Sequence, residues 1–248
     1  MTQERSPLWR NMVNMAQAIG LNLVVTVTRP QAEAAFQRRQ GAGIIPPEKH
    51  LARYRTIILL GAGGPKFWET FQTSPEMTDG HPNPLDRFAD QQVTALATVL
   101  QRLDKTITTA FPFHHIRQVI PFQALIEHSP LAGTSPIGIA IHPEYGPWFA
   151  WRGIILSEQD WPEKPALGDP PCLDCPAPCL QACPVGAARL QGLEWEVCLS
   201  ERRQESPCRH GCAARANCRV GVEHRYGEEQ TTYHAAASRR EIMKLSPI

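Results

Sequence analysis

Apolar residues recur at steps of three and four along some stretches of the chain, and form continuous runs along others. The helical spacing predicts amphipathic helices, which cover residues 8–20, 30–39 and 86–103. The apolar runs predict strands, which cover residues 21–28, 56–61, 137–141 and 148–156. Because strands and helices are mixed along the chain, the pattern predicts an α+β layered fold.

A glycine-rich stretch follows the strand predicted at 56–61. It reads Gly61-Ala-Gly-Gly-Pro65. It has neither the Lys-Ser/Thr of a P-loop nor the third glycine of a dinucleotide-binding fingerprint. We therefore expect a tight turn here rather than a nucleotide clamp.

The composition changes at residue 161. Residues 161–171 read Trp-Pro-Glu-Lys-Pro-Ala-Leu-Gly-Asp-Pro-Pro, which is the composition of a linker. The predicted organisation is therefore a first domain over 1–160, a proline-rich linker over 161–171, a cysteine module over 172–222 and a C-terminal segment over 223–248 that returns to the first domain.

Four cysteines lie close together directly after the linker. They form the string Cys172-Leu-Asp-Cys175-Pro-Ala-Pro-Cys179-Leu-Gln-Ala-Cys183-Pro184. Gaps of two and three residues that close in Cys-Pro are the spacing of an iron–sulfur loop, in which a tight turn aims successive thiolates at one cluster. The run predicts a [4Fe–4S] centre and hence electron transfer.

The other four cysteines form a looser second run. They are Cys198, Cys208, Cys212 and Cys218, and Ala216-Asn-Cys218-Arg-Val-Gly221 echoes Ala182-Cys183-Pro-Val-Gly186. In two-cluster ferredoxins the cysteine before proline ligates the other cluster. The metal ligands of the two predicted clusters are therefore Cys172, Cys175, Cys179 and Cys218 for one, and Cys198, Cys208, Cys212 and Cys183 for the other.

Each cysteine run also allows a purely structural interpretation. The thiols could form disulfides, or they could hold two zinc ions with four cysteine ligands each. Zinc usually shows two separated cysteine pairs, and disulfides need an oxidising compartment. The iron–sulfur interpretation is preferred for these reasons.

Composition and charge narrow the class of protein further. The formal net charge is +1, which gives no electrostatic footprint for nucleic acid or for an anionic membrane. The first ten residues lack the charged-then-apolar pattern of a signal peptide, and no run reaches eighteen apolar residues. We expect a cytoplasmic protein with neither a membrane nor a nucleic-acid partner.

A specific resemblance rests on two strings. Ile137-Gly-Ile-Ala-Ile-His-Pro-Glu-Tyr-Gly-Pro-Trp-Phe-Ala-Trp-Arg-Gly-Ile-Ile-Leu156 resembles the central motif of the CblC family, cytosolic proteins that remove the upper axial ligand of cobalamin. Arg225-Tyr-Gly-Glu-Glu-Gln230 resembles that family's Arg-Tyr-Ser-Glu-Glu-Gln motif. The resemblance implies a nitroreductase-like α/β/α sheet domain that binds cobalamin.

The central string is also similar to epoxyqueuosine reductase and to the reductive dehalogenases, which join such a domain to a ferredoxin-like module with two [4Fe–4S] clusters. The order of the motifs, followed by the cysteine runs, agrees with both. The Asp-Ser-Ala-Pro-Val string that carries the proton donor of epoxyqueuosine reductase is absent; residues 122–131 read Phe-Gln-Ala-Leu-Ile-Glu-His-Ser-Pro-Leu. A CblC-like protein with its own electron supply is therefore preferred.

The resemblance assigns roles to residues of both strings. It implies cofactor binding by His142, Trp148, Phe149, Arg152 and Tyr226, and catalytic roles for Arg152, Tyr145 and His128. The bland alternative is that the aromatic residues of the predicted strand are ordinary core and that Arg152 pairs with a carboxylate such as Glu228.

The expected function is reduction of cobalamin and removal of its upper ligand. Alternatives are a cobalamin-dependent reductase of a small organic substrate and a plain electron-transfer ferredoxin without a corrin. The expected cofactors are two [4Fe–4S] clusters and cobalamin, and the resemblance leaves open a role for glutathione or flavin. The expected partner is a low-potential electron donor, and the resemblance also allows a homodimer.

Overall fold

The computed structural model describes residues 7–37, 53–111, 125, 133–161 and 171–244. By contacts the chain divides into two compact units, which are treated separately below. The sheet unit comprises Met1–Leu131 and Phe149–Ala166, and the cysteine unit comprises Ala132–Trp148 and Leu167–Ile248. This division places residues 132–148, which the sequence-based boundaries assign to the first domain, with the cysteine runs.

The sheet unit is built on four antiparallel strands in the order β1-β2-β6-β3. Their bounds are β1 Leu23–Thr28, β2 Thr56–Gly63, β6 Phe149–Ser157 and β3 Thr108–Ala110. Every residue of β2 is buried, as the continuous apolar run predicts for a central strand. The predicted strands 21–28, 56–61 and 148–156 therefore all lie in one sheet.

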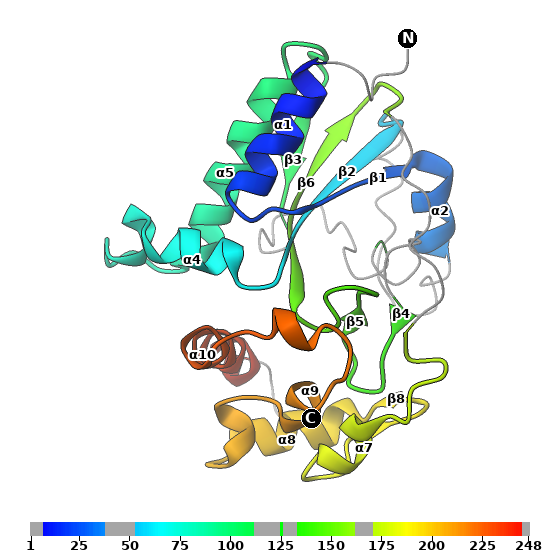
Figure 1. Ribbon diagram of the computed structural model, residues 1–248, viewed down its shortest axis with the longest axis vertical. Coiled ribbons are helices and arrows are strands. Elements are labelled where there is room, and N and C mark those ends of the chain that lie inside the picture. Colours follow the sequence, from blue (N-terminus) through cyan, green and yellow to red (C-terminus); the bar gives the residue numbers. More distant parts are fainter. Residues whose placement is uncertain (1–6, 38–52, 112–124, 126–132, 162–170, 245–248) are drawn as a thin grey trace. The chain divides into compact units, whose positions relative to one another are not determined.

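Helices cover this sheet. Their bounds are α1 Pro7–Ala18, α2 Arg29–Gln37, α4 Lys66–Gln72 and α5 Pro84–Leu100, with the short 3-10 helix η3 at Pro75–Met77. Helix α1 packs against α5, which packs against β6, while α2 packs against β1 (Figure 1). Of the apolar stripe predicted on α1, Met12 and Ala16 are fully buried, whereas Met15 is exposed. The unit is a mixed α/β structure.

The glycine-rich stretch differs from its predicted form. Gly61 and Gly63 are the last part of β2 rather than a turn, and the chain turns only at Gly64, where φ is +72°. A Cβ at Gly61 would lie 2.7 Å from the Trp151 ring on the neighbouring strand, where the β2–β6 register shifts. Glycine is therefore present because an indole covers the strand.

The end of β6 carries a buried polar network. Asp104 accepts hydrogen bonds from Ser157 and from Thr106, whose backbone N–H lies 2.8 Å and hydroxyl 2.6 Å from Oδ1. Trp161 Nε1 donates to the Ser157 hydroxyl at 2.8 Å. The network fixes the chain where it leaves the sheet.

The cysteine unit contains short elements. They are β4 Gly133–Thr134, β5 Ala140–Ile141, α7 Pro178–Ala182, β7 Ala188–Arg189, β8 Gly192–Leu193, α8 Trp195–Arg203, η4 Pro207–Arg209, α9 Ala213–Ala216, η5 Val222–His224 and α10 Glu228–Lys244. Helix α7 packs on α9, and α10 packs on α8. One small core joins Ile137, Ala188 and Ala214.

Only part of the strand predicted at 137–141 forms. Gly138 adopts a φ of +70°, and its N–H donates to the Ser135 carbonyl at 3.0 Å, which makes a turn. The strand is confined to Ala140–Ile141. The apolar run did not reveal this turn, because Gly138 is its single turn-forming residue.

Candidate functional site

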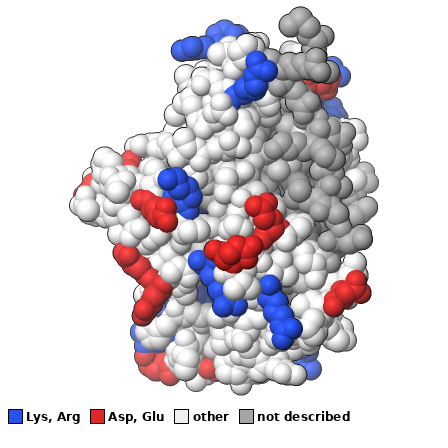
Figure 2. Space-filling model, viewed as in Figure 1, with Lys and Arg blue, Asp and Glu red and all other residues white. Residues whose placement is uncertain are grey.

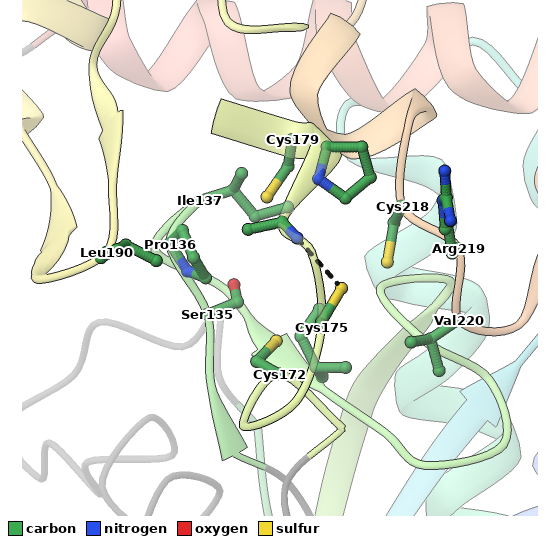
Figure 3. A pocket seen from close by; sticks show the side chains of 13 residues that line it. Ser135, Pro136, Ile137, Cys172, Cys175, Cys179, Leu190, Cys218, Arg219 and Val220 are labelled. Atoms are coloured by element: carbon green, nitrogen blue, oxygen red, sulfur yellow. Dashed lines mark hydrogen bonds between the residues drawn. The ribbon is translucent and has the colours of Figure 1, made fainter. Parts of the chain in front are cut away.

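Four thiols of the cysteine unit surround one hollow. It encloses about 460 Å³ free of protein atoms, part of it open solvent. Figure 3 shows the sulfurs turned toward this space. The thiols belong to Cys172, Cys175, Cys179 and Cys218. We call these residues the first quartet.

Local backbone geometry aims these thiols. The Cys175 N–H donates to the Cys172 carbonyl at 3.4 Å, which closes a turn. Ala177 adopts a φ of +50° at the start of α7, and its N–H donates to Cys175 Sγ at 3.4 Å. Cys179 then lies in the first turn of α7. The gaps of two and three residues thus place Cys172 and Cys175 on a turn and Cys179 at the start of a helix, so that the three thiols face the same space.

Cys218 joins the other three thiols from a distant part of the sequence. Burial, followed by the charges of the neighbouring thiols, raises the pKa of Cys172 to about 11. Cys218 is among those neighbours. Metal ligation needs the thiolate form, so a metal group binding here would displace protons.

The remaining thiols form a second group, which we call the second quartet: Cys183, Cys198, Cys208 and Cys212. Burial raises the pKa of Cys198, and the charges of the other three thiols raise it further. Cys212 is exposed, and its sulfur accepts the Arg215 N–H at 3.4 Å at the start of α9. The two groups match the predicted crossed pairing; metal binding by them stays a prediction.

All eight cysteines are free thiols, so the structure contains none of the disulfides of the purely structural interpretation. Within the described residues, no set of three or more histidine, cysteine, aspartate or glutamate side chains could hold a metal ion as it stands.

The central motif forms one wall of the first-quartet hollow. Ile137 and Ile141 line it together with Val220, which follows Cys218 by two residues. The loop of the central motif, residues 142–148, also contacts the segment after Cys218 through backbone atoms. A Cβ at Gly146 would lie 2.0 Å from the Val220 carbonyl oxygen. A Cβ at Gly221 would lie 2.4 Å from the Tyr145 carbonyl carbon. The two segments therefore fit together only with glycine at both places.

A row of rings runs along this loop. His142 lies 5.1 Å from Tyr145, and Tyr145 lies 4.5 Å from His224, measured between ring centroids. His142 Nδ1 accepts the N–H groups of Glu144 and Tyr145 at 3.1 and 3.2 Å. Burial lowers the pKa of His142, and a neutral ring whose Nδ1 accepts carries its proton on Nε2.

Trp148 and Tyr226 hold an arginine between them. The Arg215 guanidinium lies 4.8 Å from the Trp148 ring and 4.9 Å from the Tyr226 ring, and it donates to the Pro147 carbonyl at 2.6 Å. This joins both family-like strings to α9. Sequence reasoning missed Arg215 and His224; the position of Arg215 between Cys212 and Cys218 was the available signal for the first.

Within the cysteine unit, two polar atoms of the family-like strings are buried without a hydrogen-bond partner among the described residues. They are Trp148 Nε1 and Gln230 Oε1, and their side chains are 4% and 3% exposed. A buried donor or acceptor without a partner is costly. Both atoms would be satisfied by a ligand that carries amide groups.

The other predicted site residues lie elsewhere. Phe149 and Arg152 are on β6 of the sheet unit, where the Arg152 guanidinium lies 5.5 Å from the Phe67 ring. Phe149 packs edge-on against Trp151 at 6.1 Å. Glu228, the suggested partner of Arg152, is exposed at the start of α10 in the cysteine unit. His128 lies outside the described residues.

Comparison with known proteins finds similarity in structure. No protein-family model matches the chain, and no curated protein matches it significantly in sequence. A crystal structure of epoxyqueuosine reductase superposes with a TM-score of 0.60 at 14% identity, covering 91% of this chain and 68% of that one. The B12-trafficking protein CblC of C. elegans gives 0.56 at 13% identity, with 96% of both chains covered. These likenesses establish a shared fold.

Another epoxyqueuosine reductase structure contains a tRNA-Tyr stem loop with the modified base. It gives a TM-score of 0.58 at 12% identity over 89% of this chain and 67% of that one. The expected absence of a nucleic-acid partner is therefore unsupported.

Figure 2 shows basic and acidic side chains interspersed on the visible face. None of the described helices is both long and apolar enough to span a membrane.

Proposed function

We propose that the chain is a cobalamin-binding iron–sulfur oxidoreductase that reduces the cobalt and removes its upper axial ligand. The observation that carries the proposal is the hollow where the first quartet gathers: one wall is formed by Ile137 and Ile141 of the CblC-like motif. The thiols of the first quartet and residues 137–148 of a motif associated with cobalamin thus share one folded unit.

The residues present fit both groups. Four thiols facing one space suit a [4Fe–4S] cluster, and the second quartet suits another. The unpartnered Trp148 Nε1 and Gln230 Oε1 suit the amide groups at the rim of a corrin. Bound together, the groups would supply low-potential electrons and a cobalt centre that can lose a carbon ligand.

The chain's own residues would hold and orient these groups. Arg215 of α9, which lies between Cys212 and Cys218, holds Trp148 against that helix. His142 holds the motif's loop by accepting two backbone N–H groups, and Gly146 allows that loop to lie against Val220. These contacts hold the loop beside the first quartet.

The test is an anaerobic titration of reconstituted protein with hydroxocobalamin and methylcobalamin. Visible spectra are recorded before and after dithionite, with iron and sulfide counted on the same sample. We expect about eight irons per chain, a shift to the base-off spectrum and reductive loss of the methyl group. An unchanged base-on spectrum at saturation contradicts the proposal. The same iron count without any corrin response would favour a plain electron-transfer protein.

A second candidate is a cobalamin-dependent reductase of a small organic or tRNA-borne substrate. Structures of epoxyqueuosine reductase from Streptococcus thermophilus and Bacillus subtilis share the fold. Burial raises the pKa of Tyr145, which leaves its hydroxyl protonated and able to donate. Binding of a modified tRNA stem loop, and loss of substrate reduction but not of dealkylation in Tyr145→Phe, would support this candidate.

The proposal also includes a low-potential electron donor, a contribution from glutathione or flavin, and a homodimer. Addition of glutathione or reduced flavin to the titration, and light scattering with and without cobalamin, test these parts.

A further inference from the structure

A β-turn carries the first residue of the central motif into the first-quartet hollow. The Gly138 N–H donates to the Ser135 carbonyl at 3.0 Å, so Pro136 and Ile137 occupy the two central positions of this turn. Turn residues are mostly Gly, Pro, Asn, Asp or Ser, for which exposure to water costs little. Ile137 is apolar and only 7% exposed. An isoleucine is therefore buried at the corner of a turn.

The small core of the cysteine unit accounts for this burial. The core is formed by Ile137, Ala188 and Ala214. Cys179 of the first quartet and Cys183 of the second pack against it. Ile137 also lines the hollow, and Figure 3 shows its side chain on the same side of the hollow as Cys179. A residue of the motif thus belongs to the immediate surroundings of the thiols.

The wall of the hollow around Ile137 is apolar. Residues that line it together with Ile137 include Pro136, Ile141, Leu190 and Val220. Ser135 carries the one side-chain hydroxyl among the lining residues, and this hydroxyl donates to the Ile139 carbonyl at 2.5 Å. Its proton is thereby committed to the backbone. The wall offers few polar groups that would hold water beside the thiols.

An apolar wall disfavours the reduced form of a cluster. Reduction by one electron from dithionite adds one negative charge to the cluster and neither forms nor breaks a bond. Water and hydroxyl groups near the sulfurs stabilise the added charge, whereas an apolar wall that excludes water does not. The reduction potential of a cluster is therefore lower behind such a wall.

We propose that Ile137 keeps the reduction potential of the group held by the first quartet low, by excluding water from the thiols. This inference rests on the proposed iron–sulfur binding. It makes Ile137 a positioning residue of the cluster site, a role that differs from contact with a corrin. A lower potential favours passage of the electron onward from this group.

The experiment is a mediated redox titration with dithionite, followed by electron paramagnetic resonance, on the reconstituted full chain. Ile137→Val and Ile137→Thr form a matched pair, because the two new side chains have nearly the same shape and differ in one hydroxyl. The first-quartet centre is identified as the one that Cys179→Ser lacks. Arg219, the charged residue of the lining, is present in every variant.

Ile139→Val and Ile139→Thr are the control pair. Ile139 packs against the same small core but is not among the residues that line the hollow. A hydroxyl at this position can loosen the core without reaching the space between the thiols. Both potentials should therefore be the same in the two control variants.

We expect the potential of the first-quartet centre to be higher in Ile137→Thr than in Ile137→Val. The difference should correspond to about a tenfold change in the ratio of oxidised to reduced centres at fixed potential, about 59 mV for one electron. The potential of the other centre should be equal in the two variants.

Leu190→Asn decides the inference should Ile137→Thr fail to assemble its clusters. Leu190 lines the same hollow but is 72% exposed, so a side chain of similar shape should leave folding intact. We expect a rise in the potential of the first-quartet centre. Leu173→Asn is the control, because Leu173 is 70% exposed and is not among the lining residues. It should leave both potentials in place.

Equal potentials in Ile137→Thr and Ile137→Val overturn the inference, as do equal potentials in Leu190→Asn and Leu173→Asn if the threonine variant does not assemble. An equally large difference within the Ile139 pair also overturns it, because the small core as a whole would then set the potential. Wild-type protein that binds no iron and sulfide overturns the proposed function and the inference together. Wild-type protein that binds both clusters but not cobalamin overturns the proposed function alone.

Discussion

Gly146 and Gly221 make the contact between the motif's loop and the chain after Cys218 possible. Both have positive φ, of +56° and +65°, and a Cβ at either would collide with backbone of the other segment. We expect Gly221→Ala to destabilise the cysteine unit by more than the about 1–3 kcal/mol of backbone strain alone. Thermal unfolding, together with iron retained after reconstitution, measures the loss.

Alanine variants of two other glycines in the same unit distinguish the cost of backbone strain from the cost of a steric collision. Gly186 has a φ of +63° but nothing within 4 Å of its Cβ position, and Gly227 has open space without a positive φ. Gly186→Ala should show only the strain, and Gly227→Ala should be neutral or stabilising. Equal losses in Gly221→Ala and Gly186→Ala would show that the contact does not form.

Asp104 is expected to make stability depend on pH. Burial acts to raise the pKa of Asp104, but hydrogen bonds from Ser157 and Thr106 bring it below its usual value. A lowered folded-state pKa means that the contribution is present above the unfolded value near 3.9 and is lost as pH falls through the folded value. Asp104→Asn should cost about 1.5–3 kcal/mol at pH 7, and the difference should shrink in acid.

Urea unfolding followed by tryptophan fluorescence, at pH 7 and at about pH 3, measures this effect. Asp160→Asn is the matched control, because that carboxylate is exposed and pairs with Arg55 on the surface. Exposed pairs contribute little, so the control should remain close to wild type. A pH-independent loss in Asp104→Asn would mean that the ionised carboxylate is not what the network stabilises.

Residue-level inference from the sequence groups the thiols by spacing but misses the role of the glycines. A cysteine run has few structural uses, so its spacing predicts which sulfurs face one point. The role of Gly61 depends on Trp151, which is distant in sequence and becomes its neighbour only when β6 pairs with β2. No local pattern contains such a contact.

At the scale of elements, α9 is predicted to hold the motif's loop through one side chain. Arg215→Met keeps an apolar stem but removes the cation between Trp148 and Tyr226 and the hydrogen bond to Pro147. The expected loss is about 2–3 kcal/mol, from a cation–π contact and a charged hydrogen bond. Hydrogen exchange of residues 142–148 should increase.

Asn217→Ala controls for a change near the end of α9. Its side chain bonds the Ala213 carbonyl at 2.9 Å and is exposed. Exchange in residues 142–148 should therefore stay at the wild-type rate. Unchanged exchange in Arg215→Met would show that the loop is held by other contacts.

Long elements were predictable because their apolar periods repeat. Helix α5 was expected at 86–103 and spans Pro84–Leu100, and β6 was expected at 148–156 and spans Phe149–Ser157. The three-residue β3 was missed, since its Thr-Thr-Ala sequence is too short to show a repeating pattern and pairing with β6 makes it a strand. Short elements depend on partners rather than on their own residues.

For the whole molecule, the crossed pairing of thiols makes a sharp prediction. Cys218→Ser should remove the same spectroscopic centre as Cys179→Ser, and Cys183→Ser should remove the same one as Cys198→Ser. Each variant should retain about four of eight irons. Paramagnetic resonance and iron counts measure this. If Cys183→Ser instead matches Cys179→Ser, each cluster uses neighbouring cysteines and the crossed assignment is wrong.

The larger organisation was harder to foresee than the thiols. The proline-rich stretch suggested a boundary near 161, yet contacts group residues 132–148 with the cysteine runs. The reason is the packing of Ile137 with Ala188 and Ala214, together with the Gly146 contact to Val220. Composition marks where a chain is irregular, but it does not record which distant segments share a core.

The crossing also orders the events of synthesis. Cys183, Cys198, Cys208 and Cys212 have all been made before Cys218 is added, so the second quartet is complete while the first still lacks a ligand. The last thiol added belongs to the hollow walled by Ile137 and Ile141, so the first quartet is the later of the two to be complete.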